Sequence, residues 1–284
     1  MILFKLISFL PLWVLYIFSD FLYLLGFYVL RYRKKVVMDN LRHAFPEKSE
    51  QERAKIARRF FRNLTDSFAE TISLYSMPEE EIKRRFVILH PELIKERLDR
   101  GEIVLGLTAH FFHWEGQVLA FKAQVDSRLE TVYHKVNNAF FEKLMRNIRG
   151  RFGGTLVEKS DFTRNYLKER KSPRLIGLAA DQRPNNRDLR YWTFFMNRET
   201  AFYEGPEKLA KRHGHALVFA KVSKPKRGHY IYDYQVLDAP PYEGREPHSI
   251  TEAFIRITEE NIKAAPDLYL WSHKRWKHAR PKEN

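Results

Sequence analysis

The sequence contains no cysteine, and this absence excludes disulfides, thiol catalysis and zinc sites with cysteine ligands. Acidic side chains are also few relative to basic ones. The chain has 35 Asp and Glu against 50 Lys and Arg, which gives a formal net charge of +15 at pH 7. Such a charge favours anionic partners, among them nucleic acid, an anionic membrane surface, a phosphorylated substrate or an acidic carrier protein. The charge alone does not choose among them.

Charged residues are scarce at the beginning of the chain, where residues 1–30 contain only Lys5 and Asp20. The apolar run from Leu6 to Leu30 is long enough to cross a hydrocarbon core of ~30 Å. It is too long for the apolar part of a cleaved signal peptide, and no small-residue cleavage site follows it. We therefore expect residues 1–30 to form a membrane anchor.

Basic residues follow this run directly, at Arg31, Arg33, Lys34 and Lys35. By the positive-inside rule they leave the rest of the protein on the cytoplasmic face of the inner membrane. Pro11 and Asp20 interrupt the apolar run, so the segment could instead lie in the membrane interface. Spanning is favoured slightly, and a buried core helix is the third alternative.

Residues 31–100 are expected to form a helical lead-in packed on the core. Apolar residues keep helical spacing from Val36 to Ala44, and Pro46 interrupts the pattern. Ser49 and Glu52 have the spacing of a capping box and predict the start of a long amphipathic helix that ends before Pro78.

Residues 101–284 alternate between patterns typical of strands and of helices, which predicts one α/β domain. The expected architecture is a mixed, largely parallel sheet with helices on both faces. Antiparallel pairing is expected only for the last two strands, on either side of the turn at 224–228. Strands are predicted at 102–109, 130–134, 155–158, 175–180, 216–222 and 230–237, and helices from 114, at 138–149, from 161, after 205–206 and at 250–264.

The most informative motif places a histidine and a carboxylate five residues apart, at His110 and Glu115, directly after a predicted buried strand. Ligands collect at the carboxyl ends of strands in open α/β sheets. A neutral imidazole acts as a general base when a carboxylate holds its second nitrogen, and Glu115 is one turn away. The alternative is that the two residues only cap a helix. His113, three residues after His110, also suggests a metal site, but the chain has no second cluster of metal ligands.

Three further clusters carry polar or cationic side chains at places where a ligand could bind. Each also has an ordinary structural interpretation as a turn, a helix terminus or a membrane-interface segment. The candidate substrate contacts are Asp181, Gln182 and Arg183 after a predicted strand, Arg149 and Arg151 beside a glycine-rich turn, and His273 and Arg275 in the aromatic and basic segment 269–277.

These features in this order resemble the late acyltransferases of lipid A biosynthesis, the lauroyl and myristoyl transferases of Gram-negative bacteria. The resemblance covers nearly the whole chain. The His-x4-Glu pair alone is shared by many glycerolipid acyltransferases, whereas the ordered combination is more specific. It rests on the apolar start, on Arg31-Tyr32-Arg33, Val36-Val37, Asn40-Leu41 and Ala44-Phe45-Pro46-Glu47, on His110, Glu115 and Asp181, and on the segment from Pro266 to Lys277.

The resemblance implies transfer of a fatty acyl chain from acyl carrier protein, or from acyl-CoA, to a hydroxyl of a Kdo-bearing lipid A precursor. It implies a glycerolipid-acyltransferase-like fold, His110 as the general base and Glu115 as the residue that orients it. It implies no metal and no dissociable cofactor. Arg149 and Arg151 match basic residues that the family places near the active site.

Two positions depart from the family pattern and concern the acceptor. His134 and Lys135 stand where members often have Arg, and His273-Lys274-Arg275 replaces the common His-Arg-Arg. Lysine lacks the bidentate fork of arginine, so an acyltransferase acting on another membrane lipid, such as an aminolipid, remains an alternative. A non-catalytic basic binder of anionic lipid or nucleic acid is a second alternative, although no nucleic-acid motif is present.

Overall fold

The centre of the molecule is a seven-stranded sheet with the order β1-β9-β8-β2-β5-β3-β4. The computed structural model describes residues 2–184, 190–277 and 280. Neighbouring strands run parallel, except for the antiparallel pair β8 and β9, so the predicted mixed and largely parallel sheet is confirmed. The strands are β1 (Phe86–Leu89), β2 (Ile103–Thr108), β3 (Leu129–Tyr133), β4 (Thr155–Glu158), β5 (Arg174–Ala179), β8 (Ala216–Lys226) and β9 (His229–Asp238).

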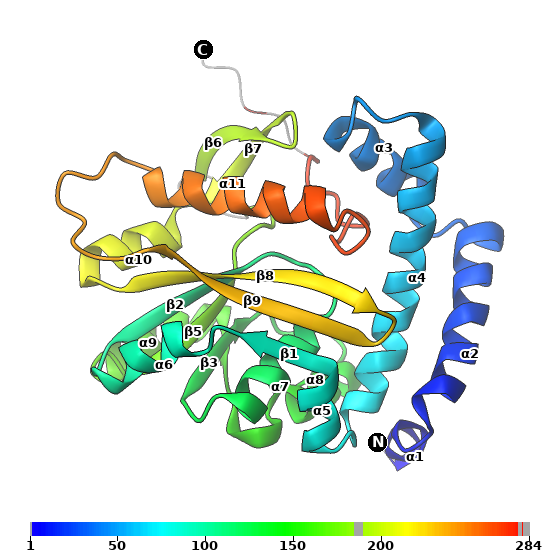
Figure 1. Ribbon diagram of the computed structural model, residues 1–284, viewed down its shortest axis with the longest axis horizontal. Coiled ribbons are helices and arrows are strands. Elements are labelled where there is room, and N and C mark those ends of the chain that lie inside the picture. The colour runs from blue at the N-terminus through cyan, green and yellow to red at the C-terminus, as the bar shows by residue number, and fades with distance from the viewer. Residues whose placement is uncertain (1, 185–189, 278–279, 281–284) are drawn as a thin grey trace.

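Helices cover both faces of this sheet, with α11 on one side and α7 and α8 on the other (Figure 1). This arrangement explains why β2 is apolar throughout, since five of its six residues are buried. The α/β architecture is therefore the predicted one. The helices of this part are α5 (Glu79–Arg85), α6 (Glu92–Asp99), α7 (Trp114–Gln124), α8 (Ala139–Arg149), α9 (Phe162–Lys168), α10 (Gly205–His213) and α11 (Ser249–Ala264), with the short 3-10 turns η2 (Arg151–Gly153) and η3 (Lys159–Asp161).

The amino-terminal helices stand at one end of the sheet, where α4 lies across the end to which the β8 arrow points (Figure 1). The predicted capping box is present at the start of α4: the Ser49 hydroxyl accepts a hydrogen bond from Glu52 N, and Glu52 accepts one from Ser49 N at 2.8 Å. The helices are α1 (Ile2–Ser8), α2 (Leu12–Leu24) with its π-helical continuation η1 (Leu25–Val29), α3 (Lys34–Ala44) and α4 (Glu50–Leu74).

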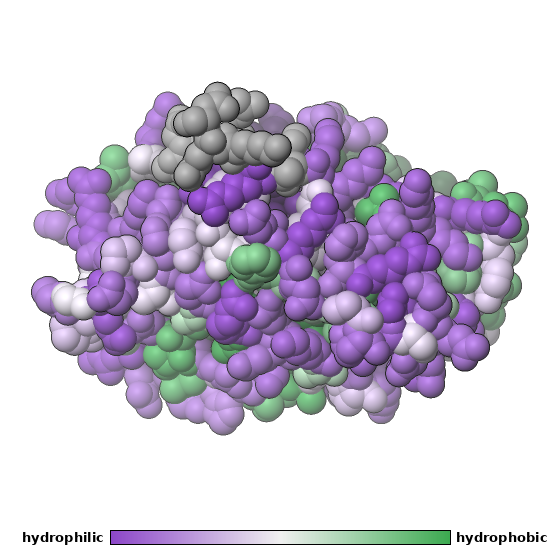
Figure 2. Space-filling view, turned by 90° about the horizontal axis from the view of Figure 1, so that it is seen from above, coloured by the Kyte–Doolittle hydropathy of each residue, from purple (hydrophilic) through white to green (hydrophobic). Residues whose placement is uncertain are grey.

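Helix α2 packs along α4 and leaves most of its own surface exposed. By length and composition Leu12–Val29 could cross a membrane, and only 22% of this segment is buried inside the molecule. Figure 2 shows hydrophobic residues gathered at the end of the molecule where Figure 1 places α1 and α2.

Two features of the fold differ from the sequence prediction. Strand β1 lies inside the predicted helical lead-in and pairs with β9, so the sheet begins at Phe86 and not after residue 101. Strands β6 (Arg190–Phe195) and β7 (Arg198–Tyr203) form a separate antiparallel hairpin that was not predicted. β1 has only four residues, and its partner strand follows it by more than 130 residues, so no local pattern marks it.

Candidate active site

His110 and Asp181 meet at the carboxyl ends of two adjacent strands. The parallel pairing of β2 with β5 sets Thr108 opposite Ala179, and each of the two side chains follows its strand by two residues. Nδ1 of His110 is 2.6 Å from Oδ1 of Asp181. The Asp181 side chain is 1% exposed and that of His110 is 23% exposed, so the pair is buried on the Asp181 side and open on the His110 side.

Electrostatics within this pair favours a charged imidazole and a charged carboxylate. Burial alone would lower the pKa of His110, but the negative charges of Asp181 and Glu115 outweigh it and raise the pKa above the ordinary 6.5. Burial likewise raises the pKa of Asp181, and the interaction with His110 more than reverses this, so that its pKa is lowered. Asp181 is therefore ionised at neutral pH, and it stabilises an added proton on His110.

The hydrogen bond with Asp181 also fixes the tautomer of neutral His110. A carboxylate only accepts hydrogen bonds, so Nδ1 carries the hydrogen and Nε2 carries the lone pair. No hydrogen bond to Nε2 comes from the residues that the structure describes. The Trp114 ring meets the imidazole edge at a centroid distance of 5.9 Å. His110 thus presents a basic nitrogen beside an aromatic wall.

Glu115 holds Arg149 rather than His110, which corrects the predicted orienting contact. Its two oxygens accept hydrogen bonds from Nε and Nη2 of Arg149, both at 2.6 Å, and Oε1 also accepts one from Trp114 Nε1 at 2.9 Å. Burial would lower the pKa of Arg149, but the charge of Glu115 raises it. Glu115 acts on His110 only through its charge, because Asp181 occupies the Nδ1 position.

The segment after α11 forms the other wall of the site. Leu270 N donates a hydrogen bond to His110 O at 3.0 Å, and Phe112 N donates one to Leu268 O at 2.9 Å. On its far side the segment is held by α3, since the Asn40 amide donates to Trp271 O at 2.8 Å and to His273 O at 3.0 Å. Both ends of the chain therefore fix the backbone of His110.

Several predicted substrate contacts gather around Asp181. Burial lowers the pKa of His273 to about 4, with Arg275, His110 and Arg183 adding to this effect against the charge of Asp181. Burial likewise lowers the pKa of Arg275 to about 10, and its guanidinium donates to Ala201 O. Gln182 is half-buried directly after Asp181. The structure thus brings His273, Arg275 and Arg183 to the rim where His110 lies.

Two of the residues singled out in the sequence make contacts that stabilise the fold. The Arg151 guanidinium donates to the carbonyls of Leu74 and Met77 at the end of α4, so its described contacts are with the backbone. His113 caps α7 by accepting from Gly116 N at 2.8 Å, and burial lowers its pKa. Among the described residues no group of three or more His, Asp or Glu side chains could hold a metal ion.

Asn40 and Tyr269 also contribute to the site, although the sequence did not predict them as site residues. Asn40 gave one signal, a polar residue on the apolar face of a predicted helix, and it is 8% exposed. Tyr269 lies within the aromatic and basic segment but was not chosen as a contact. Burial together with the charge of Asp181 raises the pKa of Tyr269 well above its ordinary value, so it stays protonated beside His110 and Asp181.

Comparison with known proteins assigns the chain to a family. The family described as bacterial lipid A biosynthesis acyltransferase matches residues 1–278. The chain belongs to the bacterial lipid A biosynthesis acyltransferases. Its relatives include the lipid A biosynthesis lauroyltransferase of Escherichia coli K12, which is 28% identical over 261 residues that cover 89% of this chain and 83% of that protein.

Two further relatives from the same organism cover different shares of this lipid A acyltransferase. The palmitoleoyltransferase is 24% identical over 254 residues, which cover 87% of this chain and 80% of that protein. The myristoyltransferase is 28% identical over 130 residues, which cover 45% of this chain and 40% of that protein. The expected resemblance is confirmed and the chain is an acyltransferase, so the alternative of a non-catalytic binder is wrong.

Proposed function

We propose that this enzyme transfers a fatty acyl chain from acyl carrier protein to a hydroxyl of a Kdo-bearing lipid A precursor, with His110 as the general base. One observation carries the proposal. The 2.6 Å contact between His110 Nδ1 and Asp181 directs the lone pair of Nε2 away from the protein interior, in a chain that matches the family over residues 1–278.

In the proposed reaction His110 Nε2 removes the proton from the acceptor hydroxyl as its oxygen attacks the thioester carbonyl carbon. The new C–O bond forms, the C–S bond breaks, and the leaving thiolate takes the proton from the imidazolium. Asp181 remains ionised throughout and stabilises the imidazolium, in the manner of the third member of a catalytic triad. No group other than donor and acceptor is consumed.

Glu115 and Arg149 support this step in different ways. The charge of Glu115 raises the pKa of His110, whereas that of Arg149 lowers it, so the two charges act on the base in opposite directions. The guanidinium has five N–H donors, of which Glu115 engages those on Nε and Nη2. We assign to Arg149 the stabilisation of negative charge on the thioester oxygen in the transition state.

A basic hollow beside this site supports an acidic donor. It has a volume of about 310 Å³ and lies between the end of β3 and α8, where Lys135, Lys143 and Arg146 surround Glu142. Burial and the charge of Lys159 lower the pKa of the neighbouring His134, and His110 contributes in the same direction. Because β3 pairs with β5 in parallel, the hollow lies at the same edge of the sheet as His110 and Asp181, where its cations would attract an acidic carrier protein.

The test incubates the purified enzyme with a Kdo-bearing lipid A precursor and acyl carrier proteins that are charged with different chain lengths. Mass spectrometry then measures the acylated product. We expect the wild type to add one acyl chain and His110→Ala to be slower by roughly 10²–10⁴. His43→Ala is the matched control, because His43 is exposed on α3 and should leave the rate unchanged.

Three results would each contradict a separate part of the proposal. Equal rates for wild type and His110→Ala would refute the general base while leaving the substrates in place. Transfer to an aminolipid but not to the lipid A precursor would refute the acceptor. Parallel reactions with acyl-CoA identify the donor, and faster transfer from acyl-CoA would overturn the assignment of acyl carrier protein.

A further inference from the structure

The outer face of α1 and α2 carries an unusual number of exposed large apolar side chains. Trp13, Ile17 and Phe21 follow one another at intervals of four residues and are 67%, 59% and 62% exposed. Leu24 continues the same face at 54%. Patches of this kind mark sites of interaction with a membrane or a protein. The opposite face buries Leu15, Ser19, Tyr23 and Phe27.

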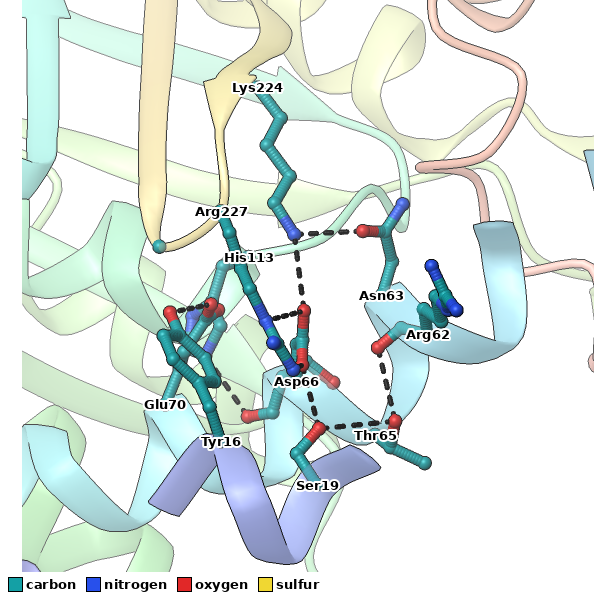
Figure 3. A network of polar contacts seen from close by, with 12 residues as sticks. Tyr16, Ser19, Arg62, Asn63, Thr65, Asp66, Glu70, His113, Lys224 and Arg227 are labelled. Atoms are coloured by element: carbon teal, nitrogen blue, oxygen red, sulfur yellow. Dashed lines mark hydrogen bonds and ion pairs between the residues drawn. The ribbon is translucent and has the colours of Figure 1, made fainter. Parts of the chain in front are cut away.

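The inner face of α2 is attached to the body of the protein by polar contacts. Tyr16 donates a hydrogen bond to Glu70 at 2.8 Å, and Ser19 donates one to Asp66 at 2.6 Å (Figure 3). We call Tyr16, Ser19, Asp20, Asp66, Glu70 and Arg227 the polar network. It lies near the middle of the apolar segment Leu12–Val29.

Arg227 extends the polar network to the turn between β8 and β9. Its guanidinium binds Asp66 at 2.6 Å and Asp20 at 2.8 Å. The guanidinium carbon also lies 4.1 Å from the centroid of the Tyr16 ring. Lys224 of β8 reaches the same Asp66 at 3.7 Å (Figure 3). The catalytic sheet and α2 are therefore joined through charged groups.

The attachment runs along the whole amino-terminal segment. Phe4 packs against Tyr75, and Phe27 packs against Phe61, so the segment is antiparallel to the second half of α4. The other side of α4 contacts the start of α7, since Thr71 lies within hydrogen-bonding distance of His113 Nε2 at 3.2 Å. Lipid therefore has access to only one face of α2.

A helix that crosses a bilayer would carry these neighbours with it into the hydrocarbon. Asp20 and Arg227 would lie near the bilayer centre together with the end of the β8–β9 hairpin, and charged groups at that depth are strongly disfavoured. A helix that lies in the plane of the interface has its apolar face in lipid and its polar face on the protein. The second geometry fits the contacts.

Cations border the exposed apolar face. Arg31, Arg33 and Lys35 are exposed where the apolar segment ends, and Arg58 and Arg62 are exposed on α4. Arg62 contacts the Tyr23 ring of α2 at 5.0 Å, so this part of α4 lies beside α2. Anionic headgroups attract basic residues at such a position, which makes an anionic lipid surface the fitting occupant.

We propose that α1 and α2 do not cross the membrane but lie in the plane of one leaflet, with Trp13, Ile17 and Phe21 in its acyl region. The apolar face continues to α8, because Phe4 packs against Phe140 at 6.5 Å. Phe140 and Phe141 are exposed there, beside the basic hollow. The membrane surface thus lies next to the opening of the site.

The absence of cysteine from the chain makes single-cysteine spin labelling of the full-length protein direct. The variants are Trp13→Cys, Ile17→Cys, Phe21→Cys and Leu24→Cys, bound to vesicles of phosphatidylethanolamine and phosphatidylglycerol. Collision rates with oxygen and with a water-soluble nickel complex give the depth of each label. We expect all four labels at similar depths within about 10 Å of the headgroups.

Two other patterns of label depth would overturn the proposal. A spanning helix would separate the labels at positions 13 and 24 by about 16 Å in depth, and such a gradient would overturn the proposal. Labels that contact neither lipid nor nickel would show a face covered by protein and would also overturn it. Lys208→Cys is the control, because Lys208 is exposed on α10, at the other end of the molecule (Figure 1).

A second measurement tests the sidedness in intact spheroplasts. A membrane-impermeant maleimide is applied to Leu3→Cys and to Lys35→Cys, before and after lysis. If the segment lies in the plane of one leaflet, the maleimide labels both positions or neither before lysis, because both ends of the segment are on the same side of the membrane. Labelling of only one of the two before lysis would contradict the proposal. Neither measurement depends on catalysis, so the proposal stands or falls separately from the proposed function.

Discussion

The negative charge of Asp181 determines how strongly His110 binds a proton. The carboxylate contacts Nδ1 at 2.6 Å, and its charge is the largest influence that raises the pKa of His110 against the effect of burial. If His110 acts as a base, its neutral form is the active one. The rate should therefore fall as the pH drops through the pKa of His110, which lies above 6.5 in the wild type.

We expect Asp181→Asn to lower kcat/KM by roughly 10²–10⁴ and to shift this acidic limb to lower pH. The amide keeps the shape of the side chain but removes the charge that raises the pKa of His110. The measurement is a pH profile of kcat/KM for both proteins. Asp126→Asn is the matched control, because Asp126 is exposed before β3, at the opposite edge of the sheet. A limb that stays in place would show that Asp181 does not act on His110.

At the scale of elements, the site depends on pairings that are remote in sequence. The sequence placed both His110 and Asp181 at the carboxyl edge of the sheet, because each follows an apolar strand. It did not show that β2 and β5 are neighbours with Thr108 opposite Ala179, and so it assigned the orienting carboxylate to the nearer Glu115. Local spacing cannot reveal a partner 71 residues away.

Other elements could be predicted where a short stretch of sequence determines them. The capping box at Ser49 and the apolar β2 were predicted correctly, because both follow from short patterns. The β6–β7 hairpin and the contact of Asn40 with the segment after α11 were not. Their stability comes from tertiary contacts rather than from the residues of the element itself.

Asn40→Leu tests the attachment of the segment after α11. The change leaves the carbonyls of Trp271 and His273 without their amide donor, and we expect it to lower the free energy of unfolding by about 1–3 kcal/mol. Trypsin should also cleave faster at Lys274. Urea unfolding and limited proteolysis measure the two effects. Asn147→Leu is the control, because Asn147 is exposed on α8, and equal losses in both variants would contradict a specific role for Asn40.

At the scale of the whole molecule, the net charge of +15 is less informative than its distribution. Arg62, with Arg58 one turn before it, is exposed on α4 beside α2, whereas α10 carries exposed cations at the far end of the molecule. Only the first group is near a membrane that covers α2. Attraction to headgroups decays within a Debye length, which is about 8 Å at physiological ionic strength.

We therefore expect the double variant Arg58→Ser, Arg62→Ser to bind vesicles containing phosphatidylglycerol about tenfold more weakly. The change should be smaller at high salt and in vesicles without anionic lipid. Co-sedimentation measures the bound fraction. Lys208→Ser with Arg212→Ser removes the same charge from α10 and should bind as the wild type does. Equal weakening in both double variants would mean that total charge, and not its position, sets the affinity.

The segment after α11 has a consequence for the order in which the enzyme matures. Leu268 and Leu270 hold the loop of His110 through backbone hydrogen bonds, and they are synthesised after every strand of the sheet. Helices α1 and α2 leave the ribosome first, and chains begin to fold from that end. The amino-terminal helices are therefore made long before the loop of His110 can be fixed, so the site is the last part of the molecule to be completed.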